Sequence, residues 1–183
     1  MRIKLPHAPY ISRKIAIDLL NSGFVTLTKG IELVSQKSLE IIENDILKEK
    51  TLDEKVNKIL DEKENDMQEM GIDPKNMFWL IKKQIAQDEG FILDNEDRFS
   101  TISHEILKEI SKNSLVSYKV SENRVKNLIY NSIVSYMRSY EDIEDIVAEK
   151  IENMQRKLIP ATHEYELVFE QLYLEELKKR GMF

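Results

Sequence analysis

The sequence predicts an all-α protein with about eight helices in two similar four-helix units, each with a short extended segment after its first helix. The composition supports this prediction: 33 % of the 183 residues are charged, 42 % are hydrophobic, and only five are Gly and four are Pro. Apolar residues also recur at intervals of three or four positions, which is the spacing of one face of a helix. In addition, the apolar positions and helix ends of the first half recur in the second half at an offset of 91 residues; for example, Val125 corresponds to Val34.

The first unit spans residues 1–92 and should begin with a helix from about Ala8 to Asn21. Gly23 suits the left-handed conformation in which many helices end. The first extended segment, Phe24–Leu27, follows this glycine. After it, a long second helix should run from about residue 31 to about residue 50, carrying its apolar positions on one face.

Two start signals predict the third and fourth helices of this unit. Thr51 and Glu54 have the spacing of a capping box, in which each side chain accepts a hydrogen bond from the backbone amide of the other residue. Asp73 followed by Pro74 predicts another start, because the carboxylate caps free amides and proline needs no donor in the first turn. We expect this fourth helix to end at Gly90.

The second unit spans residues 93–183 and should repeat these elements without a gap. Ser121–Glu149 is expected to form two consecutive helices, and Leu115–Tyr118 is the second extended segment. We expect the two extended segments to pair with each other or to cover a core. The two units should pack as one globular body, because each then buries the apolar faces of the other.

The residue types exclude several kinds of chemistry. The chain has no Cys, so it forms no disulfide, thiolate nucleophile or cysteine-bound metal site. Its three histidines, His7, His104 and His163, do not occur in a metal-binding spacing such as HExxH or Glu-x-x-His. The sequence also has no G-x-S-x-G, Walker A or G-x-G-x-x-G motif. We therefore assign no catalytic, cofactor-binding or metal-binding residue and expect a protein that is not an enzyme.

Charge and hydropathy indicate the compartment. The formal net charge of −6 favours solubility. The N-terminal stretch MRIKLPHAPYISRK lacks the apolar core of a signal peptide, and nowhere do 18 apolar residues run together. We expect a soluble cytoplasmic protein with no cofactor and no contact with a membrane.

Two groups of residues are candidates for interaction. In the second unit, basic and aromatic side chains combine in a pattern that can hold phosphates and stack bases; this group comprises Arg124, Lys126, Arg138 and Tyr130. At the C-terminus, basic residues precede terminal apolar residues, which fray unless a partner covers them; this group comprises Lys179, Arg180, Met182 and Phe183. A nucleic-acid partner is disfavoured because this half is net negative, with 13 Lys and Arg against 17 Asp and Glu after residue 91.

The C-terminal third contains a set of short motifs, namely Arg156–Leu158, Glu164–Glu166, Leu172–Tyr173, Glu175–Leu177 and Lys179–Gly181. With these motifs, together with Ser121–Val125 and the opening helix through Leu27, the chain resembles the bacterial domain-of-unknown-function family 507. The resemblance covers the whole chain and is strongest at the tail. It implies a bacterial cytoplasmic protein and supplies no active-site residues.

The residues are compatible with three classes of function. The favoured class is a non-enzymatic protein–protein interaction or scaffold protein, whose helical faces bind another protein or a second copy of the chain. This class is favoured because it requires no special residues. The second class is an RNA- or DNA-associated factor that uses the face around Arg124, Lys126 and Arg138. The third is an enzyme of unrecognised type, which would need a deep pocket with converging polar groups.

Overall fold

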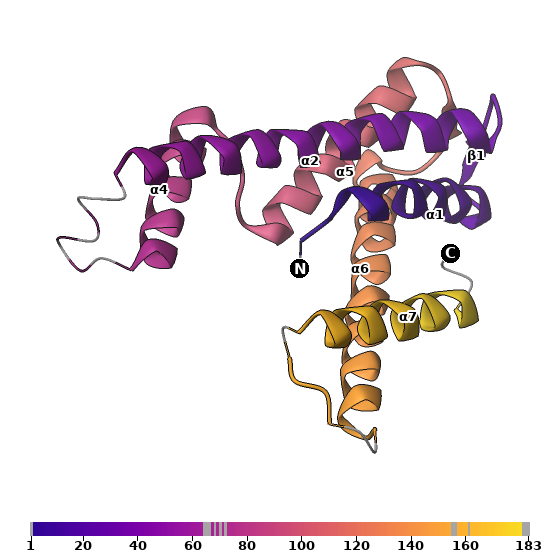
Figure 1. Cartoon of the computed structure of the whole chain (residues 1–183). Helices are drawn as coiled ribbons and strands as arrows, with labels where there is room; N and C mark the ends of the chain where they lie inside the picture. The colour runs from indigo at the N-terminus through magenta and orange to yellow at the C-terminus, as the bar shows by residue number, and fades with distance from the viewer. Residues whose placement is uncertain are drawn as a thin grey trace.

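Six α-helices and one two-stranded ribbon form the described part of the chain, which in this computed structural model comprises residues 2–63, 67, 69, 71, 73–154, 157–160 and 162–180 (Figure 1). In chain order the elements are the 3₁₀ turn η1 (Leu5–His7), α1 (Ala8–Asn21), β1 (Val25–Leu27), α2 (Ile31–Glu62), α4 (Pro74–Glu89), α5 (Asn95–Lys112), β2 (Val116–Tyr118), α6 (Glu122–Glu152) and α7 (His163–Lys179). The predicted helical class is therefore confirmed.

Several predicted helix boundaries are confirmed. The first helix has the predicted bounds, Ala8–Asn21. The Asp73 carboxylate accepts a hydrogen bond from the Lys75 amide at 3.2 Å and begins α4. At the other end of α4, Gly90 adopts the left-handed conformation with φ of 68°, which a residue without a Cβ adopts freely.

The predicted helix break at Thr51 is wrong, because α2 continues through it to Glu62. The Thr51 hydroxyl donates to the carbonyl oxygen of Leu47 at 3.0 Å, an arrangement that accommodates threonine inside a helix. Continuation keeps Leu52 and Val56 on the buried face of the helix, at 1 % and 0 % exposure. Burial of this apolar face stabilises the continuous helix more than one cap would stabilise a new one.

The predicted pair of helices in Ser121–Glu149 is also wrong, because α6 is one helix over the whole of Glu122–Glu152. Its buried face continues through the expected junction, with Met137 on one side and Ile143 on the other. These two continuous helices explain why the described residues form six α-helices rather than the predicted eight.

The two extended segments pair with each other, as one of the two predicted alternatives proposed. β1 and β2 form an antiparallel ribbon in which Val25 lies opposite Tyr118, Thr26 opposite Ser117 and Leu27 opposite Val116. The Thr28 amide extends the ribbon by donating to the Leu115 carbonyl oxygen at 3.0 Å. The ribbon joins segments that are far apart in the sequence. Because it is antiparallel, it places the start of α2 beside the end of α5, where Lys29 Nζ donates to the Asn113 carbonyl oxygen at 3.1 Å, and the start of α6 beside the end of α1.

A central core contains residues from both halves of the chain. α1 packs on α2 and α6, and α5 packs on the same two helices. The largest fully buried side chains of this core come from all four helices and include Ile11, Ile15, Leu19, Ile42, Ile102, Ile106, Ile110, Ile129 and Ile133. This core therefore depends on both halves.

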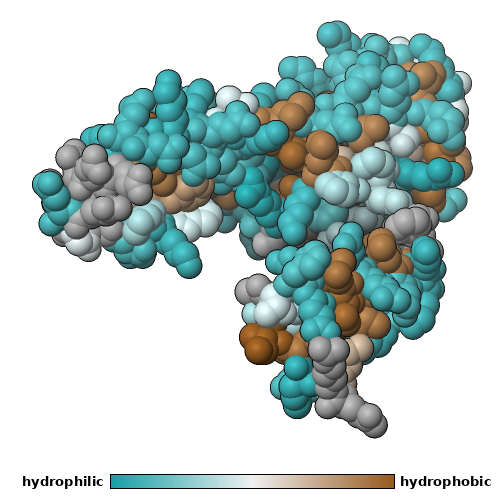
Figure 2. Space-filling model, in the orientation of Figure 1, coloured by the Kyte–Doolittle hydropathy of each residue, from teal (hydrophilic) through white to brown (hydrophobic). Residues whose placement is uncertain are grey.

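Two arms extend from this central core. The first arm consists of the C-terminal half of α2 with α4, which share a smaller core around Leu52, Val56 and Ala86. The second arm consists of the C-terminal half of α6 with α7, around Ile143, Val147 and Leu177. The arms diverge, and an open notch lies between them (Figures 1 and 2).

Candidate functional site

A buried network of charges lies at the base of the first arm. We call it the ionic joint, and it consists of Arg2, Asp45, Glu49, Asp53, Lys82 and Arg98. Its central members come from three helices and are almost fully buried: Glu49 of α2 is 5 % exposed, Lys82 of α4 is 2 % exposed and Arg98 of α5 is 5 % exposed. The ionic joint therefore fixes α4 and α5 onto the middle of α2.

Each buried cation of the ionic joint contacts two carboxylates. Arg98 places Nη1 2.7 Å from Glu49 Oε2 and Nη2 2.6 Å from Asp45 Oδ2. Lys82 Nζ lies 2.9 Å from Glu49 Oε1 and 2.7 Å from Asp53 Oδ1. Burial raises the pKa of Glu49, but hydrogen bonds from Arg98 and Lys82 outweigh it and leave the pKa below its usual value. Such pairing is what allows charges to be buried at all.

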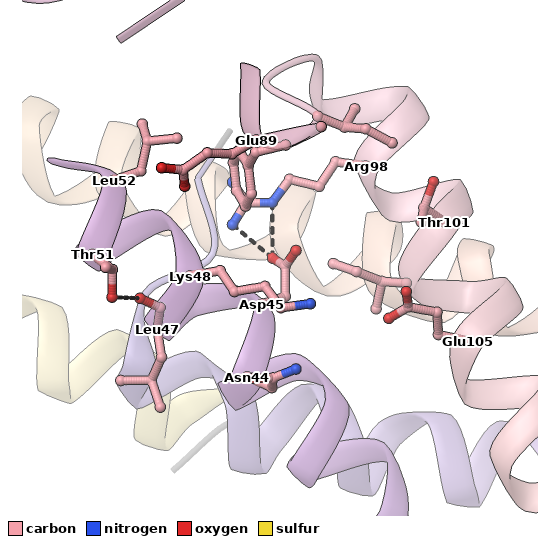
Figure 3. Close-up of a pocket in the computed structure, with 14 residues that line it drawn as sticks. Asn44, Asp45, Leu47, Lys48, Thr51, Leu52, Glu89, Arg98, Thr101 and Glu105 are labelled. Carbon is pink, nitrogen blue, oxygen red and sulfur yellow. Dashed lines mark hydrogen bonds and ion pairs between the residues drawn. The ribbon is translucent and has the colours of Figure 1, made fainter. Parts of the chain in front are cut away.

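A pocket of about 420 Å³ opens beside the ionic joint, between α2 and α5 (Figure 3). Figure 3 shows Arg98 reaching from α5 to Asp45 of α2 at the pocket wall. The Arg98 guanidinium also lies over the Phe91 ring, 4.8 Å from its centroid. Since Asp45, Glu49 and Phe91 already engage this guanidinium, Arg98 acts here as a structural group.

The base of the second arm is filled by rings instead of charges. We call this cluster the aromatic joint, and it consists of His7, Tyr136, Tyr140, Phe169 and Tyr173. The His7 ring centroid lies 3.9 Å from that of Tyr140, which in turn lies 5.1 Å from that of Tyr173. These contacts join η1, α6 and α7.

Burial changes the acidity of the aromatic joint. His7 is 2 % exposed, and its burial, together with the charge of Lys4, lowers its pKa from 6.5 to about 4. The imidazole is therefore neutral, and its Nδ1 accepts a hydrogen bond from the Lys4 amide at 3.2 Å. Burial also raises the pKa of Tyr136 and Tyr173 above the usual value for tyrosine, so that both phenols stay protonated.

Both arms carry exposed apolar side chains. In the first arm, Trp79 and Leu80 of α4 are 62 % and 65 % exposed. In the second arm, Ile159 before α7 is 71 % exposed and Leu167 of α7 is 53 % exposed. Trp79 is also held in place, because Lys82 Nζ lies 5.4 Å from the centroid of its ring.

The predicted basic and aromatic residues of α6 lie on two faces of the helix. Arg124 and Arg138 are both exposed, and their spacing of 14 residues places them on one face. Arg124 stacks on the Phe24 ring, 4.5 Å from its centroid. Lys126 and Tyr130 are half-buried on the other face: Lys126 donates to Ser100 Oγ at 3.4 Å, and Tyr130 packs against the central core. The structure therefore does not bring these four residues together.

The predicted C-terminal group is only partly described. Lys179 forms an ion pair with Glu176 at 2.8 Å, and Arg180 Nη1 donates to the Ser139 carbonyl oxygen at 3.3 Å. The first contact lies within α7, and the second holds the end of α7 to α6 of the same arm. Met182 and Phe183 lie outside the described residues.

Sequence reasoning missed both joints, although a signal for the ionic joint was present. Ile42, Glu49 and Val56 are spaced seven residues apart on α2, so Glu49 occupies an apolar position of the helical pattern. Arg98 similarly stands one turn before Ile102 on the buried face of α5. A charged residue in an apolar register indicates a buried ion pair, because burial without a partner is too costly.

Comparisons with known proteins place the chain in a family. Within the described residues, no cluster of three or more potential ligands is suited to a metal ion, and no helix has the length and apolarity needed to cross a membrane. No curated protein matches the chain. A family model described as "Protein of unknown function (DUF507)" matches residues 1–182, and the chain belongs to this family.

Proposed function

We propose that this protein is a non-enzymatic interaction module that binds another protein with the exposed apolar side chains of its two arms. One observation carries the proposal. The four most exposed large apolar side chains of the described residues all lie on the outer elements of the arms; they are Ile159, Leu80, Trp79 and Leu167. Single exposed apolar residues are ordinary, but two of them on each of two arms that border one notch are the pattern expected of a binding surface.

The position of these residues supports binding within or across the notch. α4 lies on the side of α2 that faces the notch, and the 157–160 segment lies on the side of α6 that faces it (Figure 1). Tryptophan is among the residues that contribute most to protein interfaces. Trp79 is also positioned in advance by Lys82, which reduces the entropy lost on binding.

We further propose that the two halves are copies of one structural unit, as the 91-residue offset in the sequence indicates. Under this offset α1, β1, α2 and α4 correspond to α5, β2, α6 and α7. The packing supports the proposal, because α2 packs on α4 as α6 packs on α7, and α1 packs on α6 as α5 packs on α2. In the ribbon, Thr26 lies opposite Ser117, its counterpart 91 positions later.

The two joints give the repeat its most specific support. The offset of 91 relates four members of the ionic joint, Asp45, Glu49, Lys82 and Arg98, to four members of the aromatic joint, Tyr136, Tyr140, Tyr173 and His7. Arg98 contacts both acidic residues of α2, as His7 contacts both tyrosines of α6. Lys82 of α4 contacts Glu49 of α2, and Tyr173 of α7 likewise contacts Tyr140 of α6.

A nucleic-acid partner has less support. The exposed face of α6 that carries Arg124 and Arg138 continues into Asp142 and Asp145, which are also exposed. These carboxylates oppose the binding of a phosphate backbone along the helix.

The proposal is tested by crosslinking in the source cell followed by quantitative identification of bound proteins. Two variants remove the apolar surface of one arm each: Trp79→Ser with Leu80→Ser, and Ile159→Ser with Leu167→Ser. The matched control is Leu20→Ser with Leu33→Ser, an exposed apolar pair of the central body at 52 % and 40 % exposure.

We expect the wild type and the control to capture the same partner and both arm variants to lose it. A second copy of the chain as the partner would appear as a dimer mass in solution that both arm variants abolish. The proposal fails if the arm variants capture what the control captures and their mass in solution equals that of the wild type.

A further inference from the structure

A second pocket, of about 500 Å³, lies between α5 and the start of α6. Its α5 wall presents side chains three or four residues apart on one helical face: His104, Leu107, Lys108, Ser111 and Lys112. Its α6 wall is the first turn and a half of that helix and presents Glu122, Asn123 and Lys126. Three lysines and one glutamate give this pocket a net positive charge in a chain whose net charge is −6.

The three lysines of the pocket are not engaged by carboxylates. Within the described part of the chain, Lys108, Lys112 and Lys126 have no ion pair, and the only polar contact of the three is the 3.4 Å hydrogen bond from Lys126 to Ser100. This separates them from the lysines elsewhere whose charges are paired, such as Lys82 of the ionic joint. The like charges on the two walls repel each other unless an anion lies between them.

Two carboxylates of a neighbouring hollow have other partners. Lys108 and Lys112 also border this hollow, which contains Glu40, Glu105 and Glu109. Glu40 accepts a hydrogen bond from Lys37 at 2.7 Å, and Glu109 accepts one from Asn113 at 2.8 Å. Each of these two acidic groups therefore has a partner other than a pocket lysine.

Two further features of the pocket suit an anion. The Ser111 hydroxyl oxygen is buried and has no hydrogen-bond partner among the described residues, although buried polar atoms normally have one. The pocket also includes the N-terminus of α6, where the Ser121 side chain makes no capping hydrogen bond. Free amides and the helix dipole at such an end favour negative charge.

We propose that this pocket binds a small molecule through a phosphate group. The phosphate lies between Lys108 and Lys112 on one wall and Lys126 on the other, with the Ser111 hydroxyl donating to one of its oxygens. Leu107 provides an apolar surface for the organic part of the ligand. The volume is within the range of ordinary small-molecule sites. This site is separate from the arm surfaces of the proposed interaction function.

The test is isothermal titration calorimetry of the full chain with pyrophosphate and with adenosine monophosphate at low salt. We expect saturable binding at one site, which weakens as salt is added because the contact is between charges. Lys108→Gln with Lys112→Gln should lower the affinity about tenfold or more, since two charge-assisted hydrogen bonds are lost. The matched control is Lys58→Gln with Lys83→Gln, an exposed pair outside the pocket with the same change of charge; it should change the affinity less than about twofold.

Ser111→Ala separates ligand binding from folding. Because this hydroxyl has no partner among the residues that the structure describes, the variant should melt at the wild-type temperature without ligand and bind the probes about threefold more weakly. The proposal is overturned if the wild type binds neither probe, if the Lys58 and Lys83 control loses as much affinity as the pocket variant, or if Ser111→Ala binds the probes as the wild type does.

Discussion

The two arms are attached to the central core by joints of opposite chemistry. In the first arm, buried cations and carboxylates from three helices satisfy one another, with Glu49 at the centre. In the second arm, Tyr140 lies between the rings of His7 and Tyr173. The difference shows that a buried joint between an arm and the core can be built either from paired charges or from packed rings.

The two joints should respond differently to mutation. A buried ion pair stabilises only while its partners are complete, because a remaining unpaired charge is strongly destabilising. Aromatic contacts are less interdependent, and each ring pair contributes about 0.5–1.5 kcal/mol beyond the burial of its area. The ionic joint should therefore fail abruptly on mutation and the aromatic joint gradually.

Among these predictions, Glu49→Leu should lower the free energy of unfolding the most. Glu49 contacts Lys82, Arg98 and Arg2, so its loss leaves two buried cations with one carboxylate each. We expect the free energy of unfolding to fall by about 3–5 kcal/mol, as measured by urea denaturation. The control Glu54→Leu, on an exposed side chain of the same helix, should change it by less than about 0.5 kcal/mol. Equal losses in the two variants would contradict the central role of Glu49.

Acid should weaken the aromatic joint before the ionic joint. The pKa of His7 is about 4 in the folded protein and 6.5 when unfolded, so its contribution is complete above pH 6.5 and is lost as the pH falls towards 4. The loss should approach about 3 kcal/mol. The contribution of Glu49, whose pKa is lowered on folding, is present above the usual carboxyl range and disappears only below it.

Two spectroscopic signals separate these transitions. The single Trp of the chain, Trp79, lies on the first arm and reports on the ionic joint, whereas tyrosine near-ultraviolet circular dichroism reports on the rings of the second. Between pH 6.5 and 4 the tyrosine signal should change while Trp79 emission stays constant. His7→Phe should remove most of the pH dependence of stability in this window. Persistence of that dependence in the variant would assign it to another group.

Exchanging one joint for the other tests their equivalence directly. The variant that combines Asp45→Tyr, Glu49→Tyr, Lys82→Tyr and Arg98→His builds the ring set of the second arm into the first. We expect its free energy of unfolding to lie within about 2 kcal/mol of the wild type, because buried ion networks are often replaced by apolar groups without loss. Calorimetric melting checks this expectation. A quadruple variant less stable than Glu49→Leu alone would show that the two sites are not equivalent.

The smallest effect on stability is expected for the exposed leucines of the arms. Leu80 of the first arm and Leu167 of the second are exposed, so Leu80→Ser and Leu167→Ser should each change the free energy of unfolding by less than about 0.5 kcal/mol. Thermal melting of the purified variants measures this. A loss above about 2 kcal/mol would be typical of a buried leucine and would place that side chain in the core.

Local signals allowed the sequence to predict part of the fold. The bounds of α1, the cap at Asp73 and the end at Gly90 depend on neighbouring residues alone, and all three are confirmed. The break at Thr51 was wrong because the capping spacing is also local, whereas the continuity of α2 depends on distant residues that cover Leu52 and Val56. Helix ends are therefore predicted well only where no tertiary contact opposes them.

The candidate surfaces were harder to predict than the fold. Charged residues such as Lys82 and Arg98 normally indicate solvent, and only the tertiary structure brings them to a shared carboxylate. Apolar residues normally indicate burial, but Trp79 and Leu80 are exposed, off the face of α4 that packs Phe78 and Ile81 against the small core. Lys126 was predicted to be an interaction residue together with residues of its own helix, but its neighbours in the second pocket are the lysines of α5.

The register of the ribbon has a consequence for the two halves of the chain as separate fragments. Under the proposed repeat, Thr26 faces its counterpart Ser117, and the strand of either half would then be complementary to a copy of itself. A chain cleaved between Gly90 and Asn95 would leave each fragment with half of the central core uncovered. Such fragments would reassemble with each other or form a symmetric homodimer, which is the arrangement from which gene duplication and fusion would produce the present chain.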